Sequence, residues 1–249
     1  MEPNNNFHKT FGKKPVIGMI HLAGKHPEEK IKRALEEIAL FEEEGVDAAL
    51  VENYHGDLLD VIRTINRLQS VKPNIKLGVN ILPNDFNSAF NIVNQYNCDF
   101  IQLDYVAGKY EGGYKLYTSD YSKSRETSKA IVLGGVWPKY YQPIEGSIIA
   151  TDIKDGMKIA EAIVVTGEGT GIETPIEKIK QFREILGNHP LIIGAGTNPD
   201  NIYEQLKLAD GVIVGSGIKE DYNTRNPVSR ELVKKYMSEV RRAREYSNL

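Results

Sequence analysis

Eight short apolar runs recur along this chain of 249 residues, and their spacing limits the fold more than any other feature. Successive runs begin 20 to 32 residues apart, with helix-like segments between them. The runs are Val16–Leu22, Ala48–Tyr54, Lys76–Leu82, Phe100–Val106, Ala130–Trp137, Ala162–Glu168, Leu191–Thr197 and Gly211–Ile218. Short β-branched runs that alternate with helices are typical of parallel βα units, and eight such units in a chain of this length predict a (β/α)8 TIM barrel of the α/β class.

The segments between the runs support this prediction. Glu28–Glu44 carries apolar residues on one helical face and stops at Gly45. Similar stripes occur in Leu58–Leu68, Phe86–Tyr96 and Ile176–Leu186, whereas Tyr140–Gly156 contains proline and glycine and is interpreted mostly as a loop. The intervening segments thus predict helices around the barrel.

An open, doubly wound sheet is the alternative architecture. Its glycine-rich phosphate loop should follow an early strand, but the first run ends in Met19–Gly24 without that motif. No linker-like composition divides the chain. We therefore expect a flexible, polar N-terminal tail over residues 1–14 and a single barrel domain over residues 15–249.

Composition excludes several function classes. The net charge of −3 provides no basic field for nucleic acid, and no apolar run approaches the ~20 residues that cross a membrane. Cys98 is the only cysteine, so an intramolecular disulfide and a cysteine metal cluster are excluded, and a reducing cytoplasm is the expected location. The sequence is compatible with a homo-oligomer.

The last two runs end in glycines and a hydroxyl residue. Glycine lets the backbone approach an anion closely, and barrel enzymes bind phosphate after strands seven and eight. The alternative is that the glycines only form tight turns. We favour a phosphate site formed by Gly194, Gly196, Thr197, Gly215 and Ser216.

Two carboxylates end buried runs at the expected barrel mouth. Glu52 lies near the end of the second run, directly after Val51, and Asp104 lies on the same strand face as Gln102 in the fourth. The pair could divide acid and base roles, or it could hold Mg²⁺ or Mn²⁺ together with Asn80. The structural alternative is an ion pair or hydrogen bond inside the mouth.

Further polar residues follow other runs. His21 could exchange protons near neutral pH, and Lys139 could contact an anion or donate a proton. With Glu52, Asp104 and Asn80 they complete the predicted catalytic set. The predicted substrate-orienting residues are Asn53, Gln102, Thr166 and Gly167.

These motifs, in this order, resemble the BtpA/SgcQ family of predicted TIM-barrel proteins over nearly the whole chain. The resembling stretches are Val16–Leu22, Gly45–Asn53, Gly78–Asp85, Val164–Gly171, Ala209–Lys219 and Asn226–Val228. The resemblance implies a (β/α)8 fold and a phosphate-type site. It fixes no reaction, because the family name comes from photosystem I biogenesis whereas other members look like enzymes of sugar phosphates or nucleotides.

The chain departs from the family pattern at two strands. An arginine and an asparagine of strand four are replaced by Gln102 and Asp104, and only Lys139 survives from the strand-five Asp-Val-His-x-Lys-His pattern. The leading hypothesis is an enzyme, an isomerase, lyase or hydrolase, that acts on a small phosphorylated metabolite. The second is a noncatalytic assembly or regulatory protein built on the same scaffold.

Overall fold

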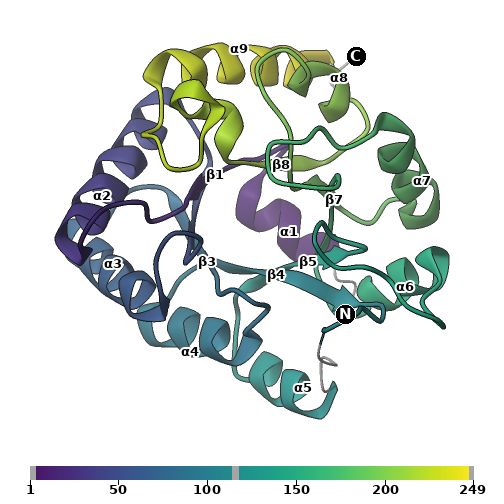
Figure 1. Ribbon diagram of the computed structural model, residues 1–249. Helices are drawn as coiled ribbons and strands as arrows, with labels where there is room; N and C mark the ends of the chain where they lie inside the picture. Colours follow the sequence, from purple (N-terminus) through teal and green to yellow (C-terminus); the bar gives the residue numbers. More distant parts are fainter. Residues whose placement is uncertain (1–3, 114–117, 247–249) are drawn as a thin grey trace.

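The computed structural model describes residues 4–113 and 118–246, which form a closed barrel of eight parallel strands (Figure 1). The strands follow one another around the barrel in sequence order, and β8 pairs with β1 to close it. The strands are β1 (Val16–Ile20), β2 (Ala48–Glu52), β3 (Lys76–Asn80), β4 (Phe100–Ala107), β5 (Ile131–Val136), β6 (Ala162–Val165), β7 (Leu191–Ile193) and β8 (Gly211–Val214). Each predicted run coincides with one strand, so the predicted TIM barrel is confirmed.

Helices surround the barrel on all sides (Figure 1). They are α2 (Pro27–Glu44), α3 (Leu58–Val71), α4 (Phe86–Tyr96), α5 (Thr118–Glu126), α6 (Ile149–Gly156), α7 (Ile176–Leu186), α8 (Ile202–Leu206) and α9 (Arg230–Tyr246), with 3-10 turns η1 (Ser216–Ile218) and η2 (Glu220–Tyr222) after β8. The expectation of a loop over Tyr140–Gly156 is wrong for its second half. There the chain forms α6. The fully buried Ile153 anchors this helix to the core, and Gly156 is its last residue rather than part of a loop.

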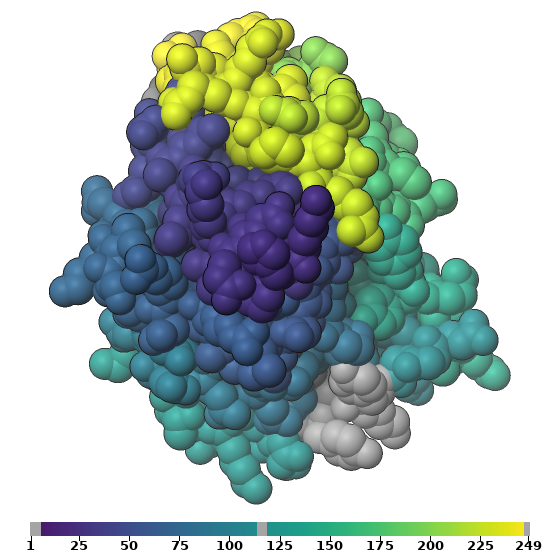
Figure 2. Space-filling view, turned by 60° about the vertical axis from the view of Figure 1, so that its left-hand side comes forward, coloured from purple at the N-terminus to yellow at the C-terminus, as the bar shows by residue number. Residues whose placement is uncertain are grey.

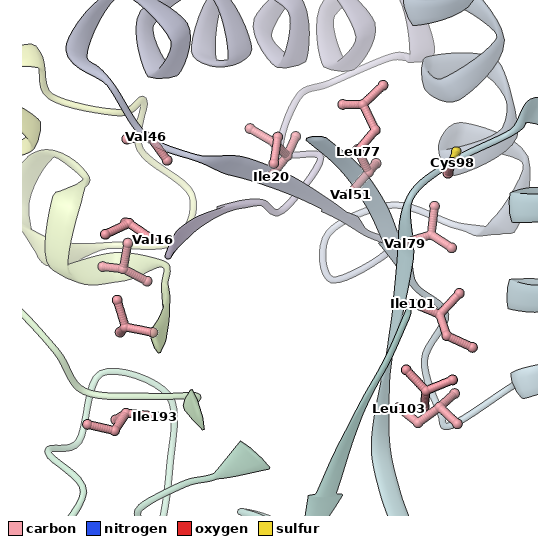
Figure 3. Packing of buried hydrophobic residues seen from close by; sticks show 14 of the residues in the cluster. Val16, Ile20, Val46, Val51, Leu77, Val79, Cys98, Ile101, Leu103 and Ile193 are labelled. Carbon is pink, nitrogen blue, oxygen red and sulfur yellow. The ribbon is translucent and has the colours of Figure 1, made fainter. Parts of the chain in front are cut away.

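Alternate strand residues face opposite sides of the barrel wall, as the pleat requires. Leu50 and Phe100 belong to an inner cluster that fills the barrel. Val51, Val79 and Ile101 lie on the outer side, between the strands and the helices (Figure 3). The same alternation carries on past the last hydrogen-bonded residues, so it determines which polar side chains project into the mouth.

The N-terminal segment is a helix rather than a flexible tail. α1 (Asn4–Phe11) lies across the centre of the barrel in Figure 1 and carries Phe7, which is fully buried. Phe11 lies one helical turn further along, and its ring centroid is 5.2 Å from that of Phe100 at the start of β4. The two phenylalanines share one helical face, and burying that face closes the base of the barrel. The tail expectation is therefore wrong for residues 4–11, and residues 1–3 lie outside the described residues.

The C-terminal helix completes the outer ring. Figure 2 shows the C-terminal segment in yellow directly beside the N-terminal segments in purple and blue. Arg230 of α9 lies 2.6 Å from Glu43 of α2, and Arg244 forms a second ion pair with Asp47. Among the described residues, every helix is too short or too polar to cross a membrane.

Candidate active site

A small cavity of about 80 Å³ lies in the barrel mouth, at the C-terminal ends of the strands. Inner-face residues of the six strands β1 to β6 and residues of the loops after β5 and β6 enclose it. The predicted site residues that line it are Glu52, Asn80, Gln102, Asp104, Lys139, Thr166 and Gly194. The described residues on its wall do not include His21, Asn53, Gly167, Gly196, Thr197, Gly215 or Ser216.

The two predicted carboxylates face this one cavity, as expected from their strand positions. Asn80 of β3 connects them: its Nδ2 donates to Glu52 Oε1 at 2.9 Å and to Asp104 Oδ1 at 3.4 Å. Tyr141, which sequence reasoning missed, donates from its hydroxyl to Asp104 Oδ2 at 2.9 Å. The mouth therefore holds a connected row of acid and amide groups across β2, β3, β4 and the loop after β5.

Burial sets the protonation of both carboxylates. It raises the pKa of Glu52 to about 7, and the nearby charge of Asp104 acts in the same direction, whereas Lys139 and the Asn80 hydrogen bond oppose it. Burial also raises the pKa of Asp104, against the hydrogen bonds from Tyr141 and Asn80. A carboxyl group with a pKa near neutrality can both accept and donate a proton at physiological pH.

His21 lies beside Glu52 but outside the cavity wall. Its Nε2 is 4.0 Å from Glu52 Oε2. Burial, followed by the positive charge of Lys219, lowers the pKa of His21 well below its usual range, so the ring is neutral and the contact is no ion pair. Lys219 is itself fully buried and pairs with Glu37 at 3.0 Å.

Two amide oxygens in the mouth have no hydrogen-bond partner among the described residues. They are Asn80 Oδ1 and Gln102 Oε1, and both are buried. With the carboxylates of Glu52 and Asp104 they form a set of oxygen donors of the kind that Mg²⁺ and Mn²⁺ prefer. The described residues contain no group of three or more His, Cys, Asp or Glu side chains that could hold a metal ion. Any cation here would therefore depend on the amide oxygens and water.

Lys139 enters the mouth from the loop after β5. Its backbone N–H donates to Thr166 Oγ1 at 2.7 Å, and its Nζ donates to Thr170 Oγ1 at 3.0 Å. Tyr54 and Tyr140, both on the cavity wall, also contact Thr170. The predicted site residues do not include Tyr54, Tyr140 or Thr170, although aromatic and hydroxyl residues that closely follow strand runs were a signal for them.

Glycines at the ends of β7 and β8 allow close packing against other parts of the chain. Gly196 has φ 73°, and a Cβ on it would lie 2.0 Å from the carbonyl oxygen of Ile172. A Cβ on Gly215 would lie 2.8 Å from the His21 ring. Both positions therefore require glycine for contacts within the chain itself.

The two hydroxyls of this region differ in their surroundings. Thr197 is buried and accepts a hydrogen bond from Tyr236 of α9 at 2.8 Å, so its side chain points away from the mouth. Ser216 Oγ faces the loop after β6, where a Cβ on Gly171 would lie 3.2 Å from it. The expectation that Thr197 offers its hydroxyl to a phosphate in the mouth is therefore not met.

Two other predicted substrate-orienting residues have structural partners. Asn53 accepts from the Leu82 N–H at 2.7 Å and donates to the Leu82 carbonyl at 3.1 Å, which joins the ends of β2 and β3. A Cβ on Gly167 would lie 2.9 Å from the Glu173 carbonyl oxygen, so this glycine allows the loop after β6 to fold back. Thr166 and Gln102 do reach the cavity.

Comparison with known proteins assigns the chain to a family. The BtpA family model matches residues 12–242. The chain belongs to the BtpA family. An uncharacterised member from Pyrococcus horikoshii is 31% identical, over 94% of this chain and 99% of the relative. The photosystem I biogenesis protein BtpA of Synechocystis is 27% identical, over 84% of this chain and 82% of that protein.

Solved structures that resemble this BtpA family member are also TIM barrels. Phosphoribosyl anthranilate isomerase from Thermus thermophilus superimposes with a TM-score of 0.61 at 15% identity, covering 92% of this chain and 98% of the isomerase. (S)-3-O-geranylgeranylglyceryl phosphate synthase from Thermoplasma acidophilum, in complex with its substrate sn-glycerol-1-phosphate, gives 0.62 at 15% identity over 96% and 98%. At this identity the likeness establishes the shared fold.

Proposed function

We propose that this BtpA family member is an enzyme that acts on a small phosphorylated metabolite, of the sugar-phosphate or nucleotide type, by acid–base chemistry in the barrel mouth. The observation that carries the proposal is Glu52. This carboxyl group ends β2 inside the mouth cavity, burial raises its pKa to about 7, and Asp104 shares its Asn80 partner. Perturbed carboxyl groups in a cavity at this end of a barrel are typical of catalytic sites.

The roles follow from charge and position. Glu52 moves a proton to or from the substrate, and Asp104 supplies the second carboxyl group. Asn80 holds both carboxyl groups in place, neutral His21 supports Glu52, and Lys139 stabilises developing negative charge. Isomerisation, lyase chemistry and hydrolysis all fit this set.

The phosphoryl group binds at the ends of β7 and β8, through backbone N–H groups near Gly194 and Gly215 and through Ser216. The likeness to barrels whose names include phosphoribosyl and glyceryl phosphate compounds supports this placement. In this proposal Thr197 contributes backbone only, because its hydroxyl is bonded to Tyr236. The single, buried Cys98 supports a reducing location such as the cytoplasm.

A second role for the same carboxylates is to bind a divalent cation. The unpartnered amide oxygens of Asn80 and Gln102 favour it, since they would complete the oxygen ligands of Glu52 and Asp104. A bound Mg²⁺ or Mn²⁺ would polarise a substrate oxygen. If Glu52 is a ligand, excess metal should partly restore the activity of Glu52→Gln.

The competing function is a noncatalytic assembly protein, which the name of the Synechocystis relative supports. A screen of phosphorylated metabolites, each paired with its unphosphorylated form, separates the two by melting temperature and by turnover. We expect the phosphorylated member of one pair to raise the melting temperature and to be converted. Failure of every compound to bind or react would favour the assembly role.

Variants then test the assignment of residues. Glu52→Gln should lower turnover by about 10²- to 10⁴-fold with binding retained, whereas the exposed Glu36→Gln should change neither. Ser216→Asp should weaken binding of the phosphorylated compound, and Ser238→Asp on the exposed face of α9 is the matched control. Turnover by Glu52→Gln at the wild-type rate, without added metal, would contradict both roles of Glu52.

A further inference from the structure

Lys139 lies on the cavity wall, and its ammonium group forms no direct ion pair among the described residues. Across residues 4–113 and 118–246, no carboxylate oxygen lies within 4.0 Å of its Nζ, and the amino group donates instead to the neutral Thr170 hydroxyl at 3.0 Å. Among the other buried or half-buried lysines, Lys219 pairs with Glu37, and Lys14 and Lys178 each donate to two backbone carbonyl oxygens, whereas Lys139 Nζ donates to one hydroxyl. A partly buried ammonium group is expected to bind a negative charge.

The Thr170 hydroxyl is shared by one ammonium group and two tyrosine hydroxyls. Lys139 Nζ at 3.0 Å, the Tyr140 hydroxyl at 3.1 Å and the Tyr54 hydroxyl at 3.4 Å all converge on Thr170 Oγ1. A neutral hydroxyl has one hydrogen and two lone pairs, so Thr170 can bond all three groups only if it donates to one of the tyrosines. A carboxylate or phosphate oxygen group has enough lone pairs for all three, and it would also neutralise the lysine.

We infer that Lys139, Tyr54 and Tyr140 form an oxyanion-binding site, in which the Thr170 hydroxyl holds the place of a ligand's carboxylate or phosphate oxygens. These three residues line the same cavity as Glu52 and Asp104, so the oxyanion binds next to the carboxyl pair. The site uses other side chains than the proposed phosphate site at the ends of β7 and β8, although Gly194 lines the same cavity. The inference stands whether or not the chain is an enzyme. Together with the proposed function, it makes the substrate a molecule with two anionic groups.

The inference predicts opposite changes in anion affinity when Thr170 and Lys139 are substituted. Thr170 lies in the loop between β6 and α7, and an anion must replace its hydroxyl before all three donors can turn to the ligand. Thr170→Ala removes this competing hydroxyl and keeps the backbone N–H that donates to Tyr140. Anion binding should therefore become tighter in Thr170→Ala and weaker in Lys139→Met.

Calorimetry and thermal melting with inorganic phosphate and with malonate, at constant ionic strength, test the site. We expect Lys139→Met to lose at least about tenfold in affinity for the preferred probe, and Thr170→Ala to gain about three- to tenfold. Tyr54→Phe, which keeps the packing, should lose about threefold. Lys180→Met on the exposed face of α7 is the matched control and should bind as the wild type does. The preferred probe shows whether the site takes phosphate or carboxylate.

Two results would overturn the inference. One is wild-type affinity in Lys139→Met, and the other is a loss in Thr170→Ala as large as that in Lys139→Met, which would make Thr170 a ligand contact. Ser216→Asp separates the inference from the proposed phosphate site. Loss of phosphate binding in Ser216→Asp but not in Lys139→Met overturns the inference alone, whereas the reverse supports it and removes the site at β7 and β8.

Discussion

Replacing Glu52 by glutamine should stabilise the folded chain at alkaline pH, independently of any activity. Glu52 is buried in the mouth, where burial holds its pKa at about 7 instead of 4.5. Between these pH values the folded chain keeps a proton that the unfolded chain has released. Stability therefore falls as the pH rises from 4.5 to 7, and the full loss is present above that range. Glutamine is neutral at every pH and removes this loss.

The size of the effect follows from the two pKa values. The difference between 4.5 and about 7 corresponds to about 3 kcal/mol at ~1.4 kcal/mol per pH unit. Most of it develops between pH 5 and pH 8. The free energy of unfolding of Glu52→Gln, relative to wild type, should therefore be about 2 to 3 kcal/mol more favourable to folding at pH 8 than at pH 5.

Urea unfolding at the two pH values measures this difference directly. The exposed Glu36→Gln on α2 makes the same chemical change without burial, and its effect should differ by less than about 0.5 kcal/mol between the two pH values. An equal effect of Glu52→Gln at pH 5 and pH 8 would refute the reasoning, because it would mean that folding does not raise the pKa of Glu52.

Three further substitutions test the fold and the site. Phe7→Ala should cost about 3 to 5 kcal/mol in urea unfolding because Phe7 is fully buried at the barrel base, and a negligible cost would restore the flexible tail. Tyr141→Phe removes a hydrogen bond that lowers the pKa of Asp104, so a carboxyl NMR titration should find that pKa raised further; an unchanged or lower value would contradict the contact. Asn53→Ala should cost about 1 to 3 kcal/mol without weakening ligand binding, whereas weaker binding at unchanged stability would return Asn53 to a substrate-orienting role.

The sequence predicted the barrel well because its two strongest signals are local. The spacing of apolar runs located all eight strands, and the alternation from Gln102 to Asp104 correctly placed both side chains on the inner face. The same alternation, applied from Ile192, would have turned Thr197 outward toward Tyr236. The sequence-based prediction instead treated Gly194, Gly196 and Thr197 as one phosphate-binding motif and did not apply the alternation to Thr197.

Other features depend on contacts that local patterns do not encode. α1 has only two phenylalanines on a short polar helix, and its burial depends on the open barrel base that eight distant strands create. The convergence of Lys139 and Thr170 joins two loops whose paths follow from tertiary packing. Contacts of this kind between two loops can be identified only from the folded structure.

The asparagine that joins β2 to β3 has a counterpart one strand further on, and together they give the rim unequal stiffness. Asn84 accepts from the Tyr105 N–H at 3.1 Å and donates to the Tyr105 carbonyl at 3.0 Å, just as Asn53 does with Leu82. The side-chain amide of each asparagine both donates to and accepts from one backbone residue, as a neighbouring strand would. Strand-like pairing therefore extends beyond the barrel wall. The half of the rim over β2, β3 and β4 is thereby braced. A metabolite larger than the 80 Å³ cavity must then be admitted from the other half, where the loop after β6 is held to the loop after β5 by side-chain contacts of Thr166 and Thr170, which give way more easily than paired backbone.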